Sequence, residues 1–184
     1  MALDVSRLVI VQYPDPSLRE VARPIDTIDD TVRAVAARML ELMHEADGAG
    51  LAATQVGLPW RLFVTRGDDR YPDRVYINPR LAGLGGDMDV RPEGCLSLPG
   101  ITLDIRRPST ATVTAQDLDN RPFTLADDDL LARVWQHEHD HINGVLIIDK
   151  MTPIDRIANR KLLKELESAA GQGAKPTGAS GRRP

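Results

Sequence analysis

Three histidines lie close together in the segment His137-Glu138-His139-Asp140-His141. On a helix, residues four positions apart share a face, so His137 and His141 can present two imidazoles to one metal ion. Glu138 lies next to the first histidine, where its carboxylate can reach a water molecule on that ion. His139 is two positions from either histidine and points elsewhere, so we exclude it as a ligand. A polar helix end with solvated histidines is the alternative interpretation.

A catalytic metal site needs a third protein ligand and one open position. The segment from Ile142 to Thr152 offers no further histidine, cysteine or glutamate, and its only carboxylate is Asp149. Cys95, the single cysteine of the chain, lies upstream in a segment that could approach the histidines. A thiolate with two neutral imidazoles suits Fe(II), Zn(II), Ni(II) or Co(II) better than Mg or Ca. For a lone cysteine, a small buried hydrophobic residue is the alternative.

The histidines need a helix to carry them, and the sequence predicts one from Asp127 to Ile142. Acidic residues in its first turn suit the helix dipole, and Gly144 stands where a C-terminal cap belongs. Leu130 and Val134 continue the stripe of the two metal-binding histidines, so both imidazoles are expected to enter the protein.

Three charged residues near these candidate ligands have open roles. Arg133 lies one helical turn before the first histidine of the motif, and we expect its side chain to be solvated, the alternative being that it reaches the rim of the pocket. Glu93 is either a hydrogen-bonding partner of the site or one half of a structural ion pair. Asp140 either orients a ligand or braces a strand.

The rest of the chain predicts two more helices and several short strands. A helix from Thr27 to about Asp47 carries one apolar stripe, and Thr27 with Asp30 resembles a capping box. A third helix opens at Thr152-Pro153, and its apolar residues step by four from Ile154 to Leu166. Strands are expected at 8–11, 62–65, 75–78, 101–105, 111–115 and 123–125, with a glycine-rich turn region at 81–86.

Length and composition indicate one globular domain without disulfides. The chain has 184 residues, of which 42% are hydrophobic and 27% charged, and it contains one cysteine. A net charge of −4 argues against a body that binds polyanions. We find no transmembrane or signal segment, so we expect no membrane association and a cytoplasmic location. The expected fold is α+β, a single domain with short antiparallel strands around the central histidine-bearing helix, and with N- and C-terminal helices.

Three segments resemble the signature motifs of the peptide deformylase family, in the order and spacing of that family. They are GAGLAATQ at 48–55, EGCLS at 93–97 and QHEHDH at 136–141. The resemblance runs from Tyr13-Pro14-Asp15 through the helix after Thr152. It implies a metal-dependent deformylase catalytic domain over residues 1–170. The residues at 171–184 have almost nothing apolar to bury, so we expect a disordered polar and basic tail there.

The resemblance implies an enzyme that removes the N-formyl group from the initiator methionine of nascent polypeptides and releases formate. It implies one divalent ion, natively Fe(II) with Zn or Ni able to take the same place, bound by Cys95, His137 and His141. Alternatives of other classes are a deacylase of other N-acyl amines, an endopeptidase, and a non-catalytic zinc-binding module.

Further roles follow from the same resemblance. Glu138 matches the general acid/base, whereas Gln55 and the backbone N–H of Leu96 match the groups that hydrogen-bond the formyl oxygen. Gly50 is expected to leave room beside the substrate. Leu130 and Val134 could form the floor of a methionine pocket, or belong to the core.

Two features bear on partners beyond the methionine. Thr102 stands where many members of the family carry arginine, which leaves contacts to later substrate residues open. Family members are thought to work at the ribosome, so the basic C-terminal helix could contact rRNA phosphates. A solvated helix face is the alternative for these basic residues. The sequence does not indicate an oligomeric state.

Overall fold

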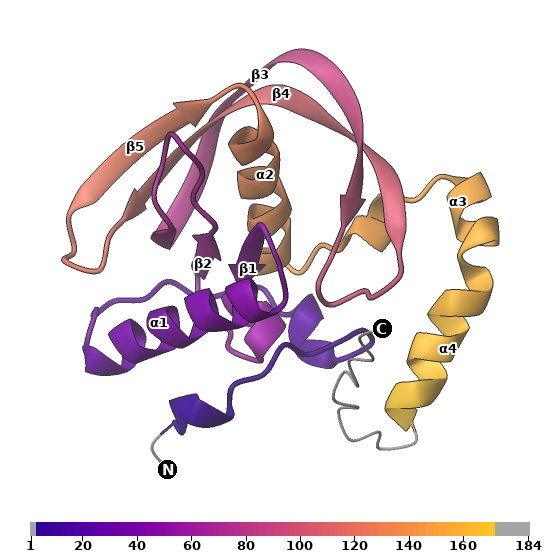
Figure 1. Ribbon diagram of the computed structural model, residues 1–184, viewed down its shortest axis with the longest axis horizontal. Coiled ribbons are helices and arrows are strands. Elements are labelled where there is room, and N and C mark those ends of the chain that lie inside the picture. The colour runs from indigo at the N-terminus through magenta and orange to yellow at the C-terminus, as the bar shows by residue number, and fades with distance from the viewer. Residues whose placement is uncertain (1–2, 172–184) are drawn as a thin grey trace, which may run out of the picture.

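The computed structural model describes residues 3–171, and its centre is a five-stranded antiparallel sheet packed against one helix (Figure 1). The strands follow one another in the order β1 (Gly50–Ala52), β2 (Leu62–Thr65), β3 (Arg74–Gly94), β4 (Thr102–Gln116) and β5 (Pro122–Asp127). The helices are α1 (Asp30–Glu45), α2 (Leu130–Ile142), α3 (Pro153–Ala158) and α4 (Arg160–Gly171). This arrangement confirms the expected α+β class.

The sheet is dominated by a long hairpin of β3 and β4, where the sequence predicted several short strands. The segment 81–86, expected as a turn region, lies within β3 instead. Register shifts on both sides of Gly85 disturb the pairing with β4 without ending it. Gly83 and Gly86 adopt positive φ angles of 58° and 70°, which glycine tolerates without a steric penalty. The glycines therefore make bulges in a continuing strand rather than its end.

The strands expected at 101–105 and 111–115 are two parts of the single strand β4. Its first half alternates buried and exposed positions, with Leu103 and Ile105 facing the core. The expected strand at 8–11 is wrong, because this segment has no strand partner in the described structure. Its Val11 N–H donates instead to the backbone oxygen of Gln55 at 2.8 Å.

Helix α1 packs an apolar face that includes Val35 and Met39 in the same core cluster as residues of β2. The helix begins later than the sequence predicted. Asp29 is its N-cap, and its carboxylate accepts from the Val32 N–H at 2.9 Å, so the capping box expected at Thr27 is wrong.

Helix α2 lies under the sheet, where its Trp135 is fully buried in a second core cluster (Figure 1). The acidic residues expected in its first turn precede it, because the helix starts at Leu130 after the N-cap Asp129. Asn143 is the C-cap, and Gly144 follows with a positive φ of 72°, as the sequence predicted.

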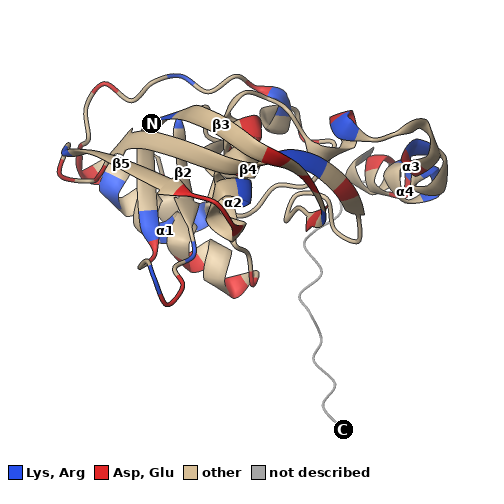
Figure 2. Ribbon diagram, turned by 90° about the horizontal axis from the view of Figure 1, so that it is seen from above, with Lys and Arg blue, Asp and Glu red and all other residues tan. Residues whose placement is uncertain are grey.

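Helices α3 and α4 lie at one end of the molecule, in Figure 1 and in the perpendicular view of Figure 2. Thr152 caps α3 and Pro153 is its first residue, as expected, but the predicted single helix is broken at Asn159. The expected apolar stripe therefore fails in α3, where Ile154 is 78% exposed. In α4, Leu162 and two further leucines pack against a third core cluster.

The tail expected beyond α4 lies outside the described residues from position 172 onward. Within residues 3–171, no helix combines the length and the apolar character that crossing a membrane requires.

Candidate metal centre

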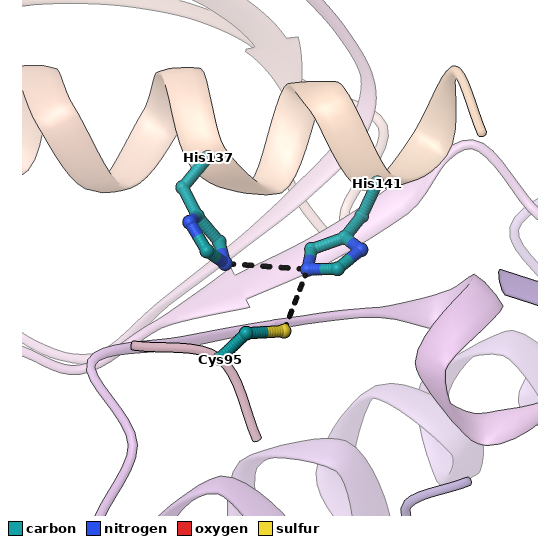
Figure 3. A group of neighbouring side chains, drawn as sticks. All are labelled: Cys95, His137 and His141. Atoms are coloured by element: carbon teal, nitrogen blue, oxygen red, sulfur yellow. Dashed lines mark hydrogen bonds between the residues drawn. The ribbon is translucent and has the colours of Figure 1, made fainter. Parts of the chain in front are cut away.

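The end of β3 and helix α2 bring one sulfur and two nitrogens together (Figure 3). Cys95 directly follows β3, and His137 and His141 lie one turn apart on α2. Nε2 of His141 lies 3.2 Å from Sγ of Cys95 and 3.2 Å from Nε2 of His137. The ligand atoms of all three residues lie within 4.8 Å of one another.

These separations suit a single tetrahedral metal ion. With metal–nitrogen bonds near 2.0 Å and metal–sulfur bonds near 2.3 Å, tetrahedral ligands lie about 3.3 Å apart for two nitrogens and about 3.6 Å for nitrogen and sulfur. The two observed distances of 3.2 Å are close to these values, and all three ligand atoms lie within 4.8 Å of one another. The donor set therefore fits a borderline or soft divalent ion.

The orientation of the His137 ring is determined by Glu93, the residue two positions before the cysteine. Nδ1 of His137 donates to Oε2 of Glu93 at 3.1 Å, which leaves Nε2 as the nitrogen that faces the cysteine. Burial alone would raise the pKa of Glu93, but hydrogen bonds from His137 and Arg107 outweigh burial and lower it to about 2. Glu93 is therefore a carboxylate at neutral pH, both hydrogen-bonded to the site and paired in an ion pair.

The two histidines differ in how readily they take a charge. Burial would lower the pKa of His137, but hydrogen bonds to Cys95 and Glu93 outweigh burial and raise it to about 10. Burial and the neighbouring His137 both lower the pKa of His141 well below its usual value. The surroundings of His137 therefore favour a positive charge on its ring, whereas those of His141 disfavour one.

Glu138 is 3% exposed and lies in the same cleft as the three ligand residues. Burial raises the pKa of its carboxyl group to about 7. Its Oε2 atom is buried and has no hydrogen-bond partner among the described residues. A carboxyl group with a pKa near neutrality and a free oxygen can both accept and return a proton.

Gln55 and Leu96 place two N–H donors beside the cysteine. Oε1 of Gln55 accepts from the Ala52 N–H at 2.9 Å, so the amide NH₂ faces Cys95 Sγ at 3.6 Å and Ser97 Oγ at 3.1 Å. The backbone N–H of Leu96 has no acceptor in the described part of the chain.

A cleft of about 420 Å³ opens over these groups. One face of α2 lines the cleft. The backbone of β1 at Gly50 lines it as well. Val134 is buried there, whereas Leu130 is 54% exposed, so Leu130 lies at the mouth of the cleft rather than at its floor. Thr102, at the start of β4, also lines the cleft and is exposed.

The structure corrects or completes several expectations about nearby residues. Arg133, expected to be solvated, is instead buried, lines the cleft and is bonded to Glu93. His139 faces Arg61 and Asn143, away from the candidate ligands, as predicted. Asp140 braces β4, because its carboxylate accepts from Nη1 of Arg107 at 2.8 Å.

The sequence interpretation missed Arg107, which is 4% exposed and lies between Glu93 and Asp140. A signal was present, because Arg107 continues the inward alternation of Leu103 and Ile105 along β4. An arginine at an inward strand position indicates a buried acidic partner, since a buried charge is costly unless it is paired.

The antiparallel sheet, the H-E-x-x-H helix beneath it and the Cys-His-His cluster are features of a metal-dependent hydrolase. A model of the polypeptide deformylase family matches residues 8–157. The chain is 43% identical over 159 residues to a peptide deformylase of Pseudomonas aeruginosa, covering 86% of this chain and 95% of that protein. It is 42% identical over 160 residues to one of Stutzerimonas stutzeri, with the same coverage of both chains.

Solved structures agree with the sequence comparisons. A plant peptide deformylase superposes with a TM-score of 0.87 at 33% identity, covering 95% of this chain and 96% of that one. A Legionella pneumophila peptide deformylase gives 0.79 at 36% identity, covering 91% and 98%. The chain belongs to the polypeptide deformylase family, and the resemblance found in the sequence is confirmed.

Proposed function

We propose that this chain removes the N-formyl group from formyl-methionyl polypeptides, with one divalent ion held by Cys95, His137 and His141. The observation that carries the proposal is the convergence of Sγ and both Nε2 atoms beside the buried carboxyl group of Glu138. An ion held by these three residues would supply hydroxide at neutral pH, because coordination lowers the pKa of water to about 7.

Glu138 has the burial and the protonation behaviour that a general acid/base requires. In this role its free Oε2 accepts the proton from the attacking water as the new C–O bond forms at the formyl carbon. The same carboxyl group then returns the proton to the departing amine nitrogen as the C–N bond breaks. The products are formate and a polypeptide with a free N-terminus, and such proton transfer contributes roughly 10²–10⁴ in rate.

Gln55 and Leu96 are proposed to stabilise the negative charge that develops on the formyl oxygen. The side-chain amide of Gln55 is held by its hydrogen bond with Ala52, and the N–H of Leu96 lies next to the cysteine in sequence. Preorganised donors of this kind cost no reorganisation during the reaction, and losing one typically costs about 3 kcal/mol.

The methionine side chain is proposed to enter the cleft between Gly50 and the face of α2 that lines it. Val134 would contact it inside the cleft and Leu130 at the mouth, because these residues lie one turn apart and both line the cleft. Thr102 lines the cleft but lacks the charge and the five N–H donors of an arginine, so a weak preference beyond the methionine is expected.

Fe(II) is the proposed native ion, with Zn(II) or Ni(II) able to occupy the same ligands. One thiolate and two imidazoles offer no hard oxygen ligand, which disfavours Mg and Ca. Because Fe(II) and thiolates oxidise, the iron enzyme should lose activity in air while a nickel-loaded sample keeps it. Equal lifetimes in air would contradict a ferrous enzyme.

The deciding experiment is formate release from a formyl-Met peptide by freshly purified protein, with elemental analysis of the same sample. An acetyl-Met peptide of the same sequence is the matched control substrate. Formate release without acetate release supports the proposal. Release of both acids favours a broader N-acyl deacylase, and release of neither with one zinc ion bound favours a non-catalytic module.

Ribosome contact through α3 and α4 stays a prediction, as does a cytoplasmic location. The two helices carry exposed basic residues together with acidic ones (Figure 2). Phosphate contacts would make co-sedimentation with ribosomes sensitive to salt. Salt-insensitive or absent co-sedimentation would favour a solvated helix face.

A further inference from the structure

Arg133 ties helix α2, which carries the two candidate histidine ligands, to the two long strands. It is 7% exposed, and its Nη1 donates to Oε1 of Glu93 at 2.6 Å and to the backbone oxygen of Ile105 at 3.0 Å. Its Nη2 donates to the backbone oxygen of Asp89 at 3.0 Å. One guanidinium on α2 therefore bonds to β3 twice and to β4 once.

Glu93 is the point where this clamp meets the candidate ligands. Its Oε1 accepts from Arg133 and from Nε of Arg107 at 2.6 Å, and its Oε2 accepts from Nη2 of Arg107 and from His137. Arg107 also binds Asp140, so it is shared between two carboxylates. Of the two arginines that bind Glu93, Arg107 lies on β4 and Arg133 lies on α2, the helix that also carries His137.

Arg133 and His137 lie one turn apart on α2 and both bind Glu93, which makes a closed ring of contacts. Any movement of the Glu93 carboxylate along α2 would break one of these two hydrogen bonds. Both terminal nitrogens of Arg133 donate to oxygens of the two long strands, and the side chain is buried although it also lines the cleft. The guanidinium is therefore arranged to hold Glu93 rather than to bind an anionic ligand.

We propose that Arg133 is a positioning residue of the metal centre. It holds Glu93 in place relative to α2, and Glu93 in turn sets the orientation of the His137 ring. Nε2 of that ring is thereby kept in place beside Cys95 and His141. The inference rests on the proposed metal site and does not depend on which amide the enzyme cleaves.

The test is the metal affinity of the purified metal-free protein, measured with Co(II) and Zn(II) by chelator competition. Replacing a residue that orients a ligand typically weakens metal affinity 10–100-fold. We expect Arg133→Met to weaken binding about tenfold and to change the visible absorption spectrum of the Co(II) protein. The matched control is Arg91→Met. Arg91 of β3 pairs with Asp89 and Asp129 near the same end of α2, and its replacement should leave both the metal affinity and the Co(II) spectrum unchanged.

A double-mutant cycle distinguishes the proposed positioning role of Arg133 from a purely structural role. Glu93→Gln should weaken metal binding by itself, and adding Arg133→Met should change it less than twofold further, since Arg133 acts through Glu93. The unfolding midpoint of each metal-free variant is measured alongside. Two results would overturn the proposal. One is a double variant whose loss of metal affinity equals the product of the losses in the two single variants, and the other is an Arg133→Met affinity within twofold of the parent.

Arg133→Lys keeps the charge beside Glu93 if the methionine variant does not fold. An ammonium cannot hold a carboxylate and two carbonyls as a planar guanidinium does, so we expect several-fold weaker metal binding. An unchanged affinity in this variant overturns the proposal. A parent protein that binds Co(II) tightly but releases no formate refutes the deformylation and leaves the role of Arg133 standing.

Discussion

A Cβ atom on Gly50 would lie 2.5 Å from Oε1 of Glu138. The backbone of β1 therefore passes the proposed acid/base at a distance that only glycine allows. Glycine is needed at this position because it leaves space for the buried carboxyl group of Glu138. The backbone of Gly50 does not have a positive φ, so conformation is not the reason for a glycine here.

Gly50→Ala is expected to lower kcat/KM at least about 10²-fold, because the added methyl group displaces the Glu138 carboxyl group whose proton transfer contributes that much or more. Metal content should not change, since the candidate ligands lie on other elements. Gly85→Ala is the control, because its added Cβ would meet Thr110 Oγ1 at an ordinary 3.4 Å. Steady-state kinetics with elemental analysis distinguish the outcomes, and parental activity in Gly50→Ala would contradict the close contact.

Glu138→Ala should keep its metal and lose turnover by roughly 10²–10⁴. Glu138→Gln tests the same point with the shape retained, because an amide cannot accept and return the proton. Both variants are measured for metal content and for formate release. Activity of either variant within tenfold of the parent would remove Glu138 from the mechanism.

Cys95→Ser should weaken metal binding, because a serine hydroxyl is a poorer ligand for a borderline or soft ion than a thiolate. The measurement is metal content after dialysis against a chelator. Ser97→Ala is a nearby control that removes a hydroxyl group without touching the candidate ligands. Retention of metal by Cys95→Ser at the parental level would count against Cys95 as a ligand.

Asp149 links the N-terminal segment to the residues after α2. Burial would raise its pKa, but the Arg19 guanidinium and the Leu146 N–H outweigh burial and hold the pKa below its usual value. A carboxyl group with a lowered folded-state pKa stabilises the fold above its unfolded pKa of about 3.9, and this stability is lost as pH falls through the folded pKa.

Asp149→Asn should therefore lower the free energy of unfolding by about 0.5–1 kcal/mol at pH 7, a modest value because the carboxylate is partly exposed. The difference from the parent should shrink at pH 3. Urea unfolding of the metal-free proteins at both pH values measures this difference in the free energy of unfolding. Asp104→Asn, at an exposed position, is the control. An equal deficit at both pH values would show that the charge of Asp149 is not responsible.

The helices were predictable because their signals are local. The spacing of Val35 and Met39, the proline after Thr152 and the glycine after α2 act within a few residues of the positions they affect. The boundaries shifted where a competing cap was better placed, as with Asp29, whose carboxylate reaches the Val32 N–H. The continuity of β3 was not predictable, because the pairing of 81–86 with the second half of β4 overrides the local turn signal.

The sequence by itself determined the candidate ligand types, their order along the chain, and the shared helix face of His137 and His141, since these follow from residue identity and the period of the helix. Only the tertiary structure decided that Sγ of Cys95 lies 3.2 Å from Nε2 of His141. It also decided that Arg133 turns inward to Glu93. A buried charge is stable only beside its partner, and here that partner lies on a different element, at a distance that no local pattern encodes.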